Sequence, residues 1–97
     1  MPTYEVLASF LNDIKHLRPD QRRDFEAAVN AFVEDLRRGQ GFRAALRVKK
    51  MAGHNRIWEL SWAPDGRATF EYGPSKRANQ PHVIWRRVET HRIFTRP

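Results

Sequence analysis

Apolar residues recur at intervals of three and four along two stretches in the first part of the chain. The first stretch, residues 4–17, carries Leu7, Phe10, Leu11, Ile14 and Leu17. The second, residues 20–38, carries Phe25, Ala28, Val29, Phe32, Val33 and Leu36. This spacing places the apolar side chains of each stretch on one stripe, so it predicts two amphipathic helices. Pro19 separates them, and Gly39 is typical of a residue at which a helix ends.

From residue 44 onward the hydrophobic period changes from that of a helix to that of a strand. Four short segments follow, AALRVKKM (44–51), IWELSW (57–62), RATFEYG (67–73) and HVIWRRV (82–88). The sequence Ala-Pro-Asp-Gly at 63–66 predicts a tight turn, with Gly66 at positive φ, and therefore an antiparallel hairpin. We expect one domain over residues 1–97, of class α+β, with two N-terminal helices packed on one face of a small antiparallel sheet.

Alternation along the hairpin separates a core face from a polar face. Ala68, Phe70 and Tyr72 should point away from Arg67, Thr69 and Glu71, and Trp58, Leu60 and Trp62 away from Ile57, Glu59 and Ser61. Trp58, Trp62 and Trp85 are expected to pack in the core. The polar face then offers Glu59, Arg67 and Lys49, with His54 in a turn beside it and His91 after the last strand. These residues lack the spacing of metal ligands, so we expect neither a metal site nor another cofactor.

Charge and composition narrow the class of partner. The 97 residues have a net charge of +7 and no cysteine. The charge favours a polyanionic partner, either nucleic acid or an acidic protein, and Lys49, Lys50 and Arg87 are candidate phosphate contacts. The absence of cysteine excludes disulfides and thiolate sites. No run of about 20 apolar residues is present, so we expect no membrane span and a cytoplasmic protein.

The order of elements, together with "LRVKKMAGHNRIWELSW", "GRATFEYG" and "VIWRRVETHRIF", resembles the RelE/ParE toxin superfamily over nearly the whole chain. The resemblance implies that Arg67 holds a scissile phosphate, that His91 acts in proton transfer and that Phe94 stacks on a base. Glu59 or His54 would be the complementary proton carrier. Two positions depart from the family pattern: Ser61 stands where many relatives carry arginine, and Glu89 where glycine is usual.

The same resemblance implies a function and its partners. A RelE-like member is an mRNA interferase, a metal-independent endoribonuclease that cleaves mRNA in the 30S decoding site of the ribosome and so inhibits translation. Its cognate antitoxin would form a hetero-oligomer with it and cover the basic face. Two alternatives stay open: a ParE-like toxin that acts on DNA gyrase without nuclease chemistry, and a catalytically inactive RNA-binding relative, for which Ser61 and Glu89 are the evidence. The presence of His91 and Glu59 beside Arg67 favours the nuclease, because a gyrase poison needs no proton carriers.

Overall fold

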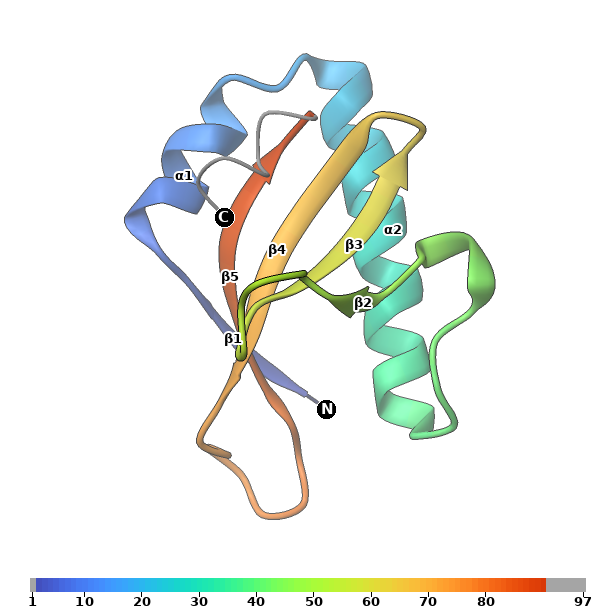
Figure 1. The fold of residues 1–97 in the computed structure, drawn as a ribbon, viewed down its shortest axis with the longest axis vertical. Helices are drawn as coiled ribbons and strands as arrows, with labels where there is room; N and C mark the ends of the chain where they lie inside the picture. The colour runs from blue at the N-terminus through green and yellow to red at the C-terminus, as the bar shows by residue number, and fades with distance from the viewer. Residues whose placement is uncertain (1, 91–97) are drawn as a thin grey trace.

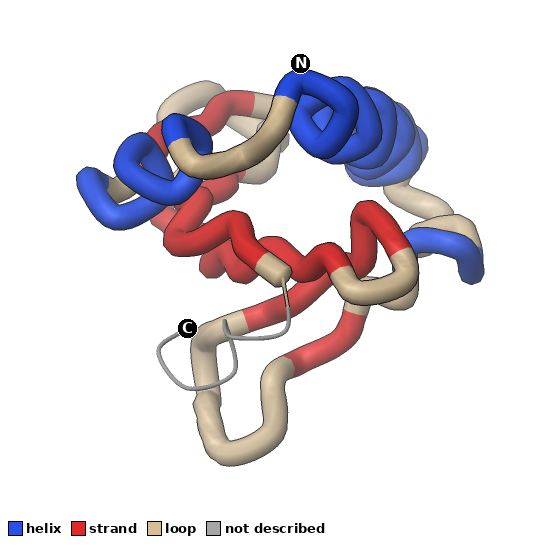
Figure 2. The backbone as a smooth tube through the Cα atoms, turned by 90° about the horizontal axis from the view of Figure 1, so that it is seen from above, coloured by secondary structure: helices blue, strands red, loops and turns tan. Residues whose placement is uncertain are grey.

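The computed structural model describes residues 2–90 and arranges them in two layers, a sheet and the helices that cover it. In chain order the elements are β1 (Thr3–Val6), α1 (Ala8–Lys15), α2 (Pro19–Arg38), the 3₁₀ helix η1 (Ala44–Leu46), β2 (Lys49–Lys50), β3 (Trp58–Ala63), β4 (Gly66–Gly73) and β5 (His82–Glu89). Within these residues the five strands form one sheet of order β1-β5-β4-β3-β2 (Figure 1). Figure 2 shows α1 and α2 on the same side of that sheet. The α+β class and the placement of both helices on one face are as predicted.

The start of the chain differs from the prediction. Residues 4–6, which the periodicity assigned to a helix over 4–17, belong to β1 (Thr3–Val6), and α1 covers only residues 8–15. β1 pairs in parallel with β5, with Thr3 opposite His82 and Val6 opposite Trp85. The sheet is therefore mixed rather than purely antiparallel, which corrects the prediction. The reason is tertiary, because the edge of β5 supplies partners for a segment whose own pattern fits either structure.

Beyond the end of β1, residues at the start of α1 and within it form hydrogen bonds with the same edge of β5. The backbone N–H of Leu7 donates to the carbonyl of Trp85 at 3.0 Å, and the Ser9 hydroxyl donates to the carbonyl of Arg86 at 2.8 Å. Two residues after Arg86 on β5, the N–H of Val88 donates to a carboxylate oxygen of Asp13 at 3.1 Å. Side chains of a helix thus complete a row of backbone hydrogen bonds that a strand begins, and the edge of β5 is not left open.

The segment between α2 and the sheet is the second departure. Helix α2 ends at Gly39, which has φ 69° as expected of a helix-ending glycine. The predicted strand over 44–51 is instead a 3₁₀ turn, η1, followed by a strand of two residues, Lys49–Lys50. Leu46 is buried against the core and Arg47 has a left-handed backbone, with φ 48° and ψ 45°. Anchoring Leu46 in the core turns the chain, which prevents a continuous strand.

The core lies between α2 and the sheet and is rich in aromatic side chains. Phe32 of α2 is fully buried and lies 4.9 Å from Phe70 and 5.4 Å from Trp85, measured between ring centroids. The core side predicted for the hairpin is confirmed for Leu60, Trp62, Ala68 and Phe70, and Trp58 packs against this core. Tyr72, predicted on the same side, is 41% exposed, and Glu59 and Thr69 of the predicted polar side are buried, which corrects the prediction at these positions. No helix within residues 2–90 combines the length and the apolar character needed to cross a membrane.

The β3–β4 turn forms where predicted, but Gly66 serves a different purpose there. Its backbone does not lie in the positive-φ region, which corrects the prediction. A methyl group built on Gly66 would instead lie 2.6 Å from the indole ring of Trp62. Glycine is required because the Trp62 ring covers its Cα atom, so the constraint is steric rather than conformational.

Candidate functional site

The strand register places two rows of polar residues across the sheet. The first row, from β2 to β5, is Lys49, Glu59, Thr69 and Arg87. The second row, from β3 to β5, is Ser61, Arg67 and Glu89. Residues directly opposite each other on antiparallel strands have Cβ atoms about 4.5–5.5 Å apart. Each row therefore brings carboxylate, hydroxyl and cationic groups to neighbouring positions.

A cleft of about 440 Å³ opens at the β2 end of these rows. Its lining residues are Arg47, Lys49, Lys50, Met51, Ala52, His54, Glu59, Ser61 and Arg67. The structure thus brings together three residues that the sequence nominated for chemistry, Glu59, His54 and Arg67. Within residues 2–90, no three His, Asp or Glu side chains are grouped so that they could hold a metal ion.

Glu59 is the buried carboxylate of this cleft. Its side chain is 7% exposed, and Lys49 Nζ lies 3.7 Å from its Oε1 atom. Lys50 points elsewhere, since its Nζ atom lies over the ring of Trp58, 5.7 Å from the centroid. Of the two predicted phosphate-binding lysines, Lys49 is therefore the one whose ammonium group sits beside the cleft carboxylate.

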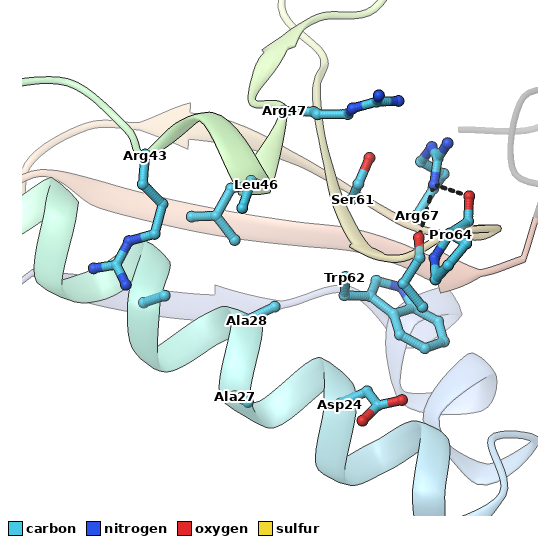
Figure 3. Close-up of a pocket in the computed structure, with 13 residues that line it drawn as sticks. Asp24, Ala27, Ala28, Arg43, Leu46, Arg47, Ser61, Trp62, Pro64 and Arg67 are labelled. Carbon is cyan, nitrogen blue, oxygen red and sulfur yellow. Dashed lines mark hydrogen bonds between the residues drawn. The ribbon is translucent and has the colours of Figure 1, made fainter.

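Arg67 stands at the rim of the cleft, above the β3–β4 turn (Figure 3). Its Nη1 atom donates to the carbonyls of Ala63, Pro64 and Gly66 at 3.2, 3.3 and 2.8 Å. Within residues 2–90 the hydrogen bonds of this guanidinium all use Nη1. The turn carbonyls orient the group, and the edge formed by Nε and Nη2 is available for a phosphate.

Arg87, a predicted RNA contact, is placed in a network of carboxylates. Its guanidinium pairs with Asp13 of α1 and with Glu89 of its own strand. The hydrogen bond to Asp13 is the main cause that raises the pKa of Arg87 above its ordinary value. Asp13 is a buried residue that sequence reasoning missed, because its position on the apolar side of a short helix gave no signal of a partner.

Two predicted residues, His91 and Phe94, lie outside the described part of the chain. β5 ends at Glu89, which is the cross-strand partner of Arg67. In the sequence His91 follows Glu89 by two positions. Its assignment to proton transfer, like that of Phe94 to base stacking, therefore stays a prediction.

Two further polar residues belong to this part of the fold, although the sequence did not nominate them as site residues. Thr69, in the centre of the first row, is fully buried, and within residues 2–90 its hydroxyl has no hydrogen-bond partner. Arg47 lines the cleft described above and also a second one of about 710 Å³ between α2, η1 and the end of β3 (Figure 3). Arg47 was missed because its segment was predicted to be a regular strand, a reading that hides the turn on which it stands.

Comparison with known proteins identifies the fold. No family model and no curated protein sequence matches this chain. In solved structures, the chain is similar to one in the E. coli DinJ-YafQ toxin-antitoxin complex (TM-score 0.65, 13% identity, covering 95% of this chain and 94% of that one). It is also similar to one in the RelB-RelE antitoxin-toxin complex from Methanococcus jannaschii (TM-score 0.60, 16% identity, 94% and 94%). A third is the YoeB/ParE toxin from Agrobacterium tumefaciens (TM-score 0.65, 13% identity, 92% and 98%). The predicted RelE/ParE-like fold is confirmed.

Proposed function

We propose that this chain, whose fold is that of RelE/ParE-like toxins, is the toxin of a type II toxin–antitoxin system and acts as a metal-independent endoribonuclease on mRNA. The observation that carries the proposal is the shared cleft of Glu59, His54 and Arg67. It joins two groups able to move a proton with a cation able to hold a phosphate, which are the parts that RNA cleavage needs.

The reaction assigned to this cleft is a transfer within the RNA backbone. A base takes the proton from a ribose 2′-hydroxyl, and the 2′-oxygen attacks the adjacent phosphorus. The bond from phosphorus to the 5′-oxygen of the next nucleotide then breaks, and an acid protonates that oxygen. Each proton transfer contributes roughly 10²–10⁴-fold to the rate, and stabilisation of the phosphate charge roughly 10²–10³-fold.

The residues divide these roles by position. Arg67 binds the scissile phosphate in this proposal. The turn carbonyls hold its Nη1 atom, and the edge formed by Nε and Nη2 can donate to two phosphate oxygens. Glu59 is favoured as the base, because its buried carboxylate is held on β3 and lines the same cleft as Arg67. His54 is exposed and lies in a turn, so it is the second candidate. His91 completes the proposal as the acid that protonates the departing oxygen.

The partners follow from charge and from the relatives. A net charge of +7 suits the mRNA and the ribosomal decoding site, where an RNA-rich surface surrounds the substrate. An antitoxin with an acidic segment would neutralise the basic cleft and exclude mRNA from it. The similar chains from E. coli and Methanococcus jannaschii were each solved in complexes with an antitoxin, which supports the same kind of partner here.

The test is an in vitro translation reaction in which mRNA 5′ ends are read by primer extension. The parent protein is expected to create new ends within translated codons, and Arg67→Ala and His91→Ala to abolish them. Arg77→Ala, which removes an exposed arginine of the β4–β5 loop, is the matched control and should cleave like the parent. Intact mRNA with the parent protein would contradict the nuclease, and accumulation of cleaved DNA–gyrase complexes would then identify the gyrase-directed alternative.

A further inference from the structure

Arg47 occupies the junction between the two clefts of the molecule. It lines both of them, and so do Ser61 and Arg67. Ser61 and Arg67 are direct cross-strand partners on β3 and β4. Figure 3 shows the Arg47 guanidinium and the Ser61 hydroxyl directed to the same side of the sheet as Arg67. Because Ser61 is small, it leaves open space between two guanidinium groups that approach it from different elements.

The backbone of Arg47 is held in a conformation that a residue with a side chain rarely adopts. Its φ of 48° and ψ of 45° lie in the left-handed region. Residues other than glycine lose about 1–2 kcal/mol there, and such positions cluster where a side chain has a task. Its N–H donates to the carbonyl of Ala44 at 3.1 Å, which closes η1 and fixes the direction in which the side chain leaves the turn.

Two other cations that line the clefts are paired with carboxylates, and Lys50 lies over the ring of Trp58. Arg43, which also lines the larger cleft, forms an ion pair with Asp35 at 2.9 Å, and Lys49 lies 3.7 Å from Glu59. Arg47 is exposed and within residues 2–90 forms no ion pair. An arginine without an anion that stands opposite a second arginine repels it, and a bound anion relieves that repulsion.

From these observations we infer that Arg47 and Arg67 form a two-guanidinium clamp for one phosphodiester group, with the Ser61 hydroxyl as a third donor between them. The inference rests on the proposed function for the identity of the polyanion, RNA. It adds a residue and a position: the phosphate lies at the junction of the clefts, above Ser61. One arginine fork can contact two oxygens of a phosphate from one side, and a second guanidinium adds donors from the other side and a second positive charge.

The test measures binding separately from cleavage. The probe is a single-stranded RNA oligonucleotide with 2′-deoxy substitutions, which cannot be cleaved, and affinity is followed by fluorescence anisotropy over a series of salt concentrations. Arg47→Gly removes the guanidinium and also relieves the strained backbone, so its Tm is expected to equal or exceed that of the parent. Affinity at low salt should fall about 10-fold. The slope of log affinity against log salt should become less negative by about 0.7, the value for one lost phosphate contact on a single strand.

Two further variants test whether the effect is specific to the forked guanidinium of Arg47. Arg47→Lys keeps the charge but not the fork, so it should restore the salt slope and only part of the affinity. Arg77→Ala should bind like the parent. An Arg47→Gly variant with the parent's affinity and slope would overturn the clamp, and so would a parent protein that does not bind the oligonucleotide. Competition by inorganic phosphate at equal strength against parent and Arg47→Gly would also contradict it. If Arg47→Gly loses affinity for the oligonucleotide but the parent protein leaves mRNA intact in the translation assay, the clamp is supported and the nuclease is rejected.

Discussion

Asp13 and Arg87, separated by 74 positions in the sequence, form a two-pronged ion pair that joins α1 to β5. Arg87 Nε donates to Asp13 Oδ2 at 2.6 Å, and Nη2 donates to Oδ1 at 3.0 Å. The Oδ2 atom also accepts the backbone N–H of Val88. The pair is nearly enclosed, with Asp13 4% and the Arg87 side chain 21% exposed. Because Arg87 also holds Glu89, the cross-strand partner of Arg67, this network fixes the end of the strand that borders the proposed site.

Removal of the Asp13 carboxylate should therefore destabilise the protein strongly. Asp13→Ala removes the acceptor of the Val88 N–H and the two-pronged partner of Arg87, which keeps its contact with Glu89. Loss of one partner of an enclosed ion pair costs about 3–5 kcal/mol. The free energy of unfolding, from urea denaturation followed by tryptophan fluorescence, measures it. Glu34→Gln provides the control, since the Glu34–Arg38 pair is exposed and should contribute at most about 0.5 kcal/mol. An Asp13→Ala variant as stable as Glu34→Gln would show that the pair is not needed.

The features of the fold that depend on the hydrophobic period within a single segment could be predicted from the sequence. α2, the β3–β4 hairpin and the two faces of that hairpin followed from local patterns, and so did the meeting of Glu59 with Arg67 on one surface. β1 could not be predicted in the same way, because it is a strand only through its pairing with β5, about 79 residues away.

The candidate site was predictable only in part for a related reason. Alternation places Arg67 and Glu59 by their position on strands, but Arg47 and Asp13 enter through tertiary structure. Arg47 depends on the turn that follows η1, and Asp13 on the packing of α1 against an edge of β5. A pattern along one segment contains neither piece of information, so charged residues of this kind are found only once the fold is known.

Asp35 links the end of α2 to the following loop, and we expect it to make the free energy of unfolding depend on pH in the acid range. Hydrogen bonds from the side chain and then from the backbone N–H of Arg43 lower the pKa of Asp35 from 3.8 to about 2. A carboxyl whose pKa is lower in the folded state stabilises that state above its ordinary pKa, and the effect is lost as pH falls through the folded-state value. Parent and Asp35→Asn should differ in unfolding free energy by a constant amount above about pH 5, and the difference should decline progressively towards about pH 1. A difference that does not change over this interval in urea denaturation would contradict the assignment.

Gly66 and Trp62 should be coupled through direct contact. Gly66→Ala places a methyl group against the indole ring, and overpacking of this kind costs about 1–3 kcal/mol. In a Trp62→Phe background the same change should cost much less, because the smaller ring leaves room for the methyl group. A double-mutant cycle of unfolding free energies measures the coupling. Equal costs in both backgrounds would show that Gly66 is needed for its backbone and not for the contact.

Glu59 and His54 can be separated as candidate bases by their effects on cleavage and on binding. Glu59→Gln keeps the shape of the side chain but cannot accept the 2′-hydroxyl proton as a carboxylate does, so cleavage in the translation assay should fall by roughly 10²–10⁴-fold. Affinity for the uncleavable oligonucleotide should not fall, because the change removes a negative charge from a cleft that binds phosphate. His54→Ala should change the rate much less if Glu59 is the base. The reverse result, a large loss of cleavage in His54→Ala and normal cleavage by Glu59→Gln, would identify His54 as the base. It would leave Glu59 as a structural partner of Lys49, the interpretation that its 3.7 Å ion pair also allows.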